Sequence, residues 1–274
     1  MLTPLLLLAL IAADEPSTDD QQRRDAVARL APAKAKQLQV LVGEQQEKAT
    51  LAPQPLLRWS NPTAGSVFGE VYLWTVRERP VAIASIYRWY HPLKDSTVEI
   101  VSMTSAPIEA REDQRVLWQA PAGGLEFKAL DKSPPPAATA AARLGQMRGL
   151  AREFSATLAD ERGGQRVTRE LRLLNQPVHR YADEARGLID GALFAFVETT
   201  DPEAWLLIEA VKTGEERSWR CGLARMNADD LKVSRGSSPL AEWPKIVQPW
   251  RYRTAHYTLF GFDPEMVKLE DARP

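Results

Sequence analysis

Only one cysteine, Cys221, occurs among the 274 residues of this chain. An intramolecular disulfide therefore cannot form, and the hydrophobic core has to hold the fold together. The three histidines, His91, His179 and His256, lie in separate regions, and none has a second ligand at the short spacing typical of zinc sites. The sequence accordingly predicts neither a metal site nor a bound cofactor.

Motifs that bind phosphate or activate a nucleophile are also missing. The chain has no G-x-G-x-x-G, no G-x-x-x-x-G-K and no H-E-x-x-H, and the glycines of 65–69 have the wrong spacing for a nucleophile elbow. The net charge does not indicate a class of binding partner either, because its formal value is only −1. A nucleic-acid-binding domain usually carries a strong excess of basic residues, so we expect no nucleic-acid partner.

The N-terminus has the character of a secretory signal peptide. An apolar run from Leu5 to Ala13 ends in small residues and is followed at once by Asp14 and Glu15. The run is shorter than the roughly 20 residues that a membrane-spanning helix needs. We predict cleavage after Ala13 and a mature protein outside the cytoplasm, without a membrane span. No lysine or arginine precedes the apolar run, which is atypical of such signals.

Two helices are expected. A short one covers about 19–30, where Asp19 and Asp20 complement the positive end of the helix dipole and Pro32 follows. A long one covers 137–162, between three prolines and Gly163-Gly164. Its apolar stripe contains Leu144, Met147, Ala151, Phe154 and Leu158, whereas Arg143, Arg148 and Arg152 are placed on its solvated side. Residues 37–42 are compatible with either helix or strand.

A first hairpin is predicted for 67–76 and 81–90, with 77–80 as the turn. In that register Tyr72, Trp74, Tyr87 and Trp89 share one face. Aromatic side chains on an exposed sheet face can stack on a sugar or a peptide, whereas on a covered face they form core. Core is the favoured interpretation, and these four residues are the candidate binding site. A short strand is predicted at 56–60, and strands at 97–104 and 125–130 would continue the meander of this hairpin.

A second hairpin is predicted for 192–199 and 204–211, around the turn 200–203. Here Leu193, Ala195 and Val197 would face Ala210, Ile208 and Leu206 as core. Further strands are expected at 217–226, 231–234 and 256–262. Glu198 and Glu209 share the other face, but they would be roughly 13 Å apart along the strand, too far for a glycosidase pair.

Cys221 and Glu70 are the candidates for catalytic groups. Cys221 lies mid-strand, where a lone cysteine usually behaves as a small apolar residue. Glu70 lies among aromatic residues on a strand expected to be buried, so its carboxylate has to be paired or protonated. Arg58 and Arg88 are its candidate partners, and a structural ion pair is favoured over a catalytic acid.

Four groups of residues occur in a distinctive order: 57–62 with Gly69 and the following strand, 143–148, 170–174, and 190–197 with 201–203. Together they resemble a family of secreted proteins from planctomycete-type bacteria. The resemblance extends from about Pro53 to His256. It implies one architecture for most of the chain and no activity, cofactor or catalytic residue.

These observations predict an α+β protein made mostly of antiparallel β-sheets, in two meander halves at about 53–130 and 167–262 joined by the helix 137–162. The full division is a signal peptide (1–13), an N-terminal segment (14–52), the globular domain (53–262) and a tail (263–274). We expect a secreted, non-catalytic interaction or structural protein. The alternatives are a cofactor-free hydrolase with a site assembled from dispersed residues such as His91, His179 or Glu70, and a module that binds carbohydrate or peptide through the aromatic face.

Overall fold

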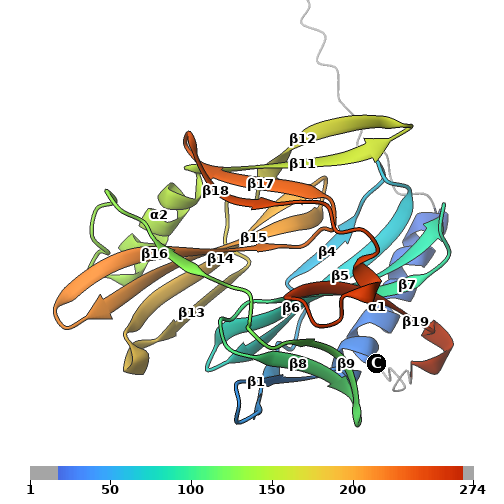
Figure 1. Cartoon of the computed structure of the whole chain (residues 1–274), viewed down its shortest axis with the longest axis horizontal. Coiled ribbons are helices and arrows are strands. Elements are labelled where there is room, and N and C mark those ends of the chain that lie inside the picture. Colours follow the sequence, from blue (N-terminus) through green and yellow to red (C-terminus); the bar gives the residue numbers. More distant parts are fainter. Residues whose placement is uncertain (1–17, 268–274) are drawn as a thin grey trace, which may run out of the picture.

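The computed structural model describes residues 18–267, and the predicted signal peptide lies outside this range. The described chain is built mostly from antiparallel strands with two α-helices, as the α+β prediction requires. Figure 1 shows α1 and α2 on opposite sides of the molecule.

The first half of the chain, 18–120, contains one helix and the first nine strands. They are α1 (Thr18–Gln37), β1 (Gln39–Val42), β2 (Glu47–Lys48), β3 (Thr50–Leu51), β4 (Leu57–Ser60), β5 (Ser66–Val76), β6 (Arg79–His91), β7 (Ser96–Ser102), β8 (Ile108–Glu112) and β9 (Arg115–Ala120). Residues 39–42 are therefore a strand, and α1 continues through Pro32 to Gln37.

The second half, 140–243, repeats this order. It contains α2 (Ala140–Ala151), β11 (Phe154–Arg162), β12 (Gln165–Leu173), β13 (His179–Asp183), β14 (Leu188–Glu198), β15 (Asp201–Thr213), β16 (Glu216–Arg225), β17 (Asp230–Arg235) and β18 (Ser238–Trp243). Two further strands lie outside the halves: β10 (Phe127–Ala129) follows the first and β19 (Tyr257–Phe262) follows the second. Three short 3₁₀ turns occur at Glu184–Arg186, Pro249–Arg251 and Pro264–Met266.

Strand pairing shows that the two halves have the same topology. Adding 122 to both members of the pair Gly69–Tyr87 gives the pair Gly191–Glu209. The same addition converts β4–β5 pairs into β13–β14 pairs. It also converts the β3–β5 pairs into the β12–β14 pairs. The outer strands follow the orders β2-β1-β8-β9 and β12-β11-β17-β18. We call 18–120 the first repeat and 140–243 the second repeat.

A matched packing detail supports the equivalence. A Cβ atom on Gly69 would lie 2.4 Å from the ring of Trp59, and one on Gly191 would lie 2.6 Å from the ring of Tyr181. In each repeat, therefore, a glycine on the central strand leaves room for an aromatic ring from the neighbouring strand.

The repeats exchange their last strands. β10 follows the first repeat but pairs with β16 of the second, and β19 follows the second repeat but pairs with β7 of the first. The expected strand at 125–130 therefore does not extend the first hairpin's sheet. Apolar residues form a core around each helix and a third core between the two hairpin sheets. The exchange and the shared core tie the repeats together.

The long helix predicted for 137–162 is wrong in its second half. α2 ends at Ala151, and Phe154–Arg162 is strand β11, which pairs with both β12 and β17. Phe154, Ala156 and Leu158 are buried with the two-residue period of a strand, so tertiary pairing overrides the helical spacing. Gly163 and Gly164, both at positive φ, form the turn between β11 and β12 and do not end a helix.

Both hairpin registers also differ from the prediction. The first turn consists of Arg77 and Glu78, both at positive φ, so that Tyr72 faces Ala84 and Gly69 faces Tyr87. In the second hairpin Leu193 faces Leu207. A shift by an odd number of residues exchanges the faces of one strand relative to its partner. Thus Leu193, Ala195 and Val197 do lie in a core, but Leu206, Ile208 and Ala210 lie on the opposite side of the sheet.

Candidate functional site

The four aromatic residues proposed as a binding face do not share one face. Tyr72 and Trp74 are 2% and 1% exposed and pack in the core around α1. Tyr87 and Trp89 are on the other side of the sheet, at the core between the repeats. The one-residue register difference separates the two pairs, so they cannot form a common stacking platform.

Glu70 forms an ion pair with Arg58, one of its two predicted partners. Arg58 Nε lies 2.8 Å from Glu70 Oε1, and the Tyr72 hydroxyl donates to the other carboxylate oxygen. The carboxylate is buried while the Arg58 side chain is largely exposed. Arg88 lies over the ring of Tyr90, with its guanidinium carbon 5.2 Å from the ring centroid.

The structure places the other candidates apart in the fold. His179 Nε2 lies 2.9 Å from the carbonyl oxygen of Glu78, and His91 ends β6. Cys221 is 1% exposed, and burial raises the pKa of its thiol to about 11, which keeps it protonated. The prediction of Cys221 as a core residue is confirmed. Within 18–267 no group of three or more His, Cys, Asp or Glu residues is placed to hold a metal ion.

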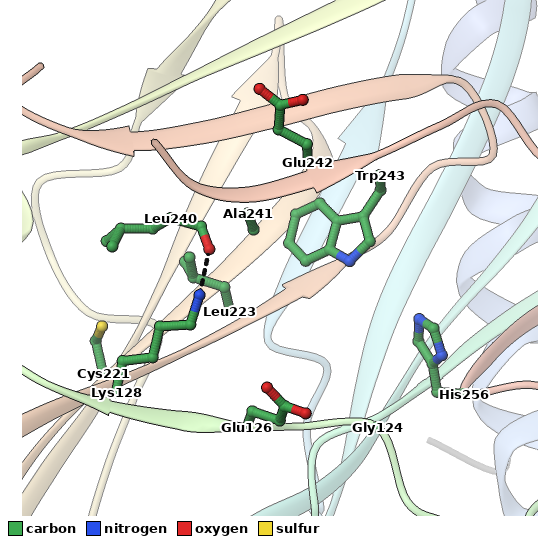
Figure 2. Close-up of a pocket in the computed structure, with 10 residues that line it drawn as sticks. All are labelled: Gly124, Glu126, Lys128, Cys221, Leu223, Leu240, Ala241, Glu242, Trp243 and His256. Atoms are coloured by element: carbon green, nitrogen blue, oxygen red, sulfur yellow. Dashed lines mark hydrogen bonds between the residues drawn. The ribbon is translucent and has the colours of Figure 1, made fainter. Parts of the chain in front are cut away.

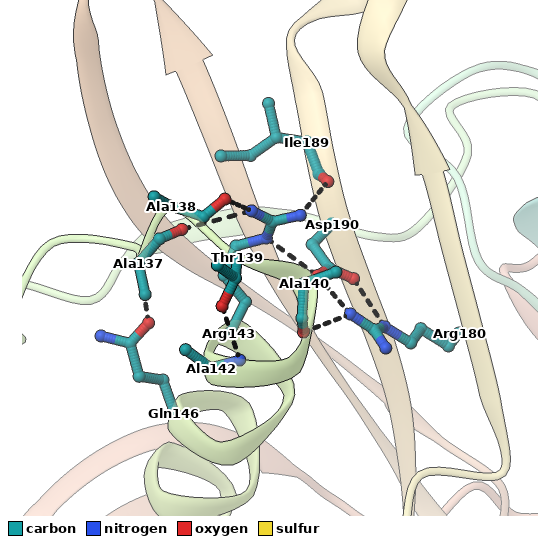
Figure 3. A network of polar contacts seen from close by, with 10 residues as sticks. All are labelled: Ala137, Ala138, Thr139, Ala140, Ala142, Arg143, Gln146, Arg180, Ile189 and Asp190. Atoms are coloured by element: carbon teal, nitrogen blue, oxygen red, sulfur yellow. Dashed lines mark hydrogen bonds and ion pairs between the residues drawn. The ribbon is translucent and has the colours of Figure 1, made fainter.

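Arg143 was expected on a solvated helix face, but it is buried. Figure 3 shows its guanidinium between α2 and β14, where Nε donates to Asp190 Oδ2 at 2.9 Å. Its other nitrogens donate to the carbonyls of Ala137, Ala138 and Ile189, and Arg180 from β13 donates to the same carboxylate. Since every contact of this cluster is within the protein, it joins α2 to the sheet.

Sequence reasoning missed a cavity of about 370 Å³ that opens between β10 and β18 (Figure 2). These are the two end strands of the nine-stranded sheet, so each has one edge without a partner strand in the described chain. We call it the edge cavity. It is lined by Gly124, Glu126 and Lys128 on one edge, residues 240–243 on the other, Cys221 and Leu223 behind, and His256 at one end. No motif marks it, because its walls are far apart in sequence.

A single side chain spans the edge cavity. Lys128 Nζ on β10 donates to the carbonyl oxygen of Leu240 on β18 at 2.5 Å. Figure 2 shows this bond on one side and the Trp243 indole toward the His256 end, with the Glu126 carboxylate between the two edges. Burial, with the nearby Arg225 charge, lowers the pKa of His256. The cavity thus combines two sheet edges, the Trp243 ring and several polar groups.

A cluster of three acids, with Glu203 buried and Glu99 and Asp201 half-buried, lies where the second hairpin meets β7 and β19. Burial raises the pKa of Glu99 to about 7, and the Tyr257 hydroxyl donates to this carboxylate. Burial and neighbouring acid charges raise the pKa values of Asp201 and Glu203 well above the ordinary range. Their carboxylates accept from the amides of Asn61 and Asn227. These contacts join β7 to β19 and the second hairpin to its neighbours, so the ionisation of the cluster affects stability.

We predict that this cluster makes the protein less stable at alkaline pH. A carboxyl group whose folded pKa is raised contributes stability that is present below its unfolded pKa and lost as pH rises through the folded value. Between pH 6.5 and 8, Glu99 alone should lower the free energy of unfolding by about 1 kcal/mol. The lowered pKa of His256 makes stability increase as pH rises, but only at pH values below its ordinary pKa of 6.5.

The measurement is chemical denaturation across this pH window. Glu99→Gln keeps the acceptor for Tyr257 and should remove about 1 kcal/mol of the pH dependence, while the exposed Glu126→Gln should retain it. Identical pH profiles for wild type and Glu99→Gln would contradict the assignment.

Neither a protein-family model, nor a curated protein, nor a solved structure matches this chain. Its class is therefore defined by its own fold, an α+β protein of two strand-exchanged repeats with a cavity between two sheet edges. The resemblance to secreted planctomycete-type proteins stays a prediction. Among the described residues, no helix is both long and apolar enough to cross a membrane.

Proposed function

We propose that this protein works outside the cytoplasm as a non-catalytic interaction protein that binds its ligand in the edge cavity. The observation that carries the proposal is the position of this cavity between two sheet edges that have no partner strand in the described chain. Unpaired strand edges present N–H and C=O groups to a partner. The half-buried Trp243 adds a ring on which a ligand can pack.

The electrostatics of the cavity support binding over turnover. Cys221 has a raised pKa and is a poor nucleophile, and Lys128 is engaged by the Leu240 carbonyl. Figure 2 shows Cys221 and His256 on opposite sides of the cavity, so they do not form a nucleophile and base pair.

The binding test uses purified full-length protein against arrays of peptides and oligosaccharides. We expect retention of at least one ligand class, recovery of that ligand with unchanged mass, and at least tenfold weaker binding by Trp243→Ala. The control is Trp250→Ala, which removes an indole that is 51% exposed and does not line the cavity. Equal binding by both variants, or chemical conversion of the ligand, would contradict the proposal.

The location is tested separately by cell fractionation and N-terminal sequencing. The apolar run before Asp14 leads us to expect a chain that begins near this residue and is found outside the cytoplasm. A cytoplasmic protein that retains Met1 would contradict it.

A hydrolase is the second candidate function, because His256 and Glu126 line the same cavity. The lowered pKa of His256 keeps its imidazole neutral at pH 7, the form that accepts a proton. If a hydrolytic activity is found, His256→Gln should abolish it without changing the unfolding midpoint. His179→Gln is the matched control, because His179 lies outside the cavity.

A further inference from the structure

The edge cavity is one point at which the two repeats differ. In the second repeat the gap between the exchanged strand β10 and the end strand β18 is open. The equivalent gap in the first repeat lies between the exchanged strand β19 and the end strand β9. Since the repeats have the same topology, whatever occupies the first gap indicates what the second gap accommodates.

The protein's own chain occupies the first gap. The backbone N–H of Gln119 on β9 donates to the carbonyl of Arg253 at 2.9 Å, and the Trp118 indole donates to the carbonyl of Ala255 at 2.7 Å. The Arg253 guanidinium donates to the carbonyl of Leu117 and lies 5.0 Å from the ring centroid of Phe260 on β19. The segment 250–256 thus bridges the two strands by backbone and side-chain contacts.

The same carbonyl position is contacted in both repeats. The pairs Ile108–Ala120 and Leu231–Trp243 correspond when 123 is added, which makes Leu240 the equivalent of Leu117. Arg253 donates to Leu117 in the first repeat, and Lys128 donates to Leu240 in the second. By the same step, Glu242 is the equivalent of Gln119, so its backbone N–H is directed to the edge cavity.

The length of the connecting segments explains why only one gap is filled. Thirteen residues, 244–256, connect β18 to β19, and they include the segment that fills the first gap. Only six residues, 121–126, connect β9 to β10, which is too short a segment to fill the second gap in the same way. The second repeat therefore has an equivalent strand edge that no segment of the described residues, 18–267, covers.

We infer that the edge cavity takes an extended polypeptide segment from a partner, which adds to β18 as segment 250–256 adds to β9. The inference rests on the proposed function and specifies its ligand class. A carbonyl of the bound segment accepts from the Glu242 N–H, and the exposed carboxylate of Glu126 favours a basic side chain beside it.

The experiment measures binding of the full-length protein to the acetylated and amidated peptide Pro-Trp-Arg-Tyr-Arg-Thr-Ala-His, which copies 249–256. Glu242→Pro removes the N–H on the free edge of β18, where proline is tolerated. We expect a Kd in the micromolar range and at least tenfold weaker binding by Glu242→Pro. Glu242→Ala keeps the N–H and should lose no more than about threefold.

Peptide variants provide a test that does not depend on the folding of Glu242→Pro. A peptide with alternate amides N-methylated should bind at least tenfold more weakly to the wild-type protein, because strand addition uses backbone N–H groups. Equal binding of methylated and unmethylated peptides, or no binding at millimolar concentration, would overturn the inference. Trp243-dependent binding of an oligosaccharide without peptide binding would overturn it too, while leaving the proposed function intact.

Discussion

Asp190→Ala is expected to lower the free energy of unfolding by about 3–5 kcal/mol, because it leaves a buried cation without its counter-ion. Asp190 is 3% exposed, and its carboxylate accepts from Arg143 at 2.9 Å and from Arg180 at 2.7 Å. The Arg143 side chain is only 10% exposed, so water cannot replace the lost partner. The loss would be measured by urea denaturation at pH 7.

The control for this prediction is Asp183→Ala. Asp183 forms an ion pair with Arg186, whose side chain is 57% exposed. Such exposed pairs contribute little, and we expect a change of less than about 1 kcal/mol. If Asp190→Ala and Asp183→Ala unfold at the same urea concentration, the cluster in Figure 3 does not join α2 to the sheet as described.

Phe154→Ala is expected to cost a similar amount, about 3–5 kcal/mol, the usual range for removing a buried phenylalanine ring. Phe154 is 5% exposed at the start of β11 and packs in the core around α2. The sequence predicts this burial from a helical stripe, whereas the structure explains it by strand pairing. Comparison of denaturation midpoints gives the size of the effect.

Arg148→Ala is the matched control, because Arg148 is only half-buried on α2 and donates to the side chain of Gln176. Its removal should change stability by less than about 0.5 kcal/mol. A change at Arg148 as large as that at Phe154 would show that the core around α2 is wrongly assigned.

The edge cavity could not be predicted from the sequence, for a physical reason. Lys128 and Leu240 are 112 positions apart in sequence, and their contact depends on the exchange of β10 into the sheet of the second repeat. Hydrophobic periodicity reports which side of a strand is buried but not which strand lies beside it. The repeat itself is hard to detect because equivalent positions, such as Trp59 and Tyr181, share aromatic character but not identity.

The sequence by itself determined that the chain is rich in antiparallel strands, that it contains two long hairpins, that Cys221 is core and that Glu70 needs an arginine partner. These features follow from local composition and period. Tertiary structure decided the turn at Arg77 and Glu78, and hence which side chains share a face. It also ended α2 at Ala151, because the residues that follow gain more from pairing with two strands than from another helical turn. Both outcomes depend on contacts between distant segments, which no local pattern records.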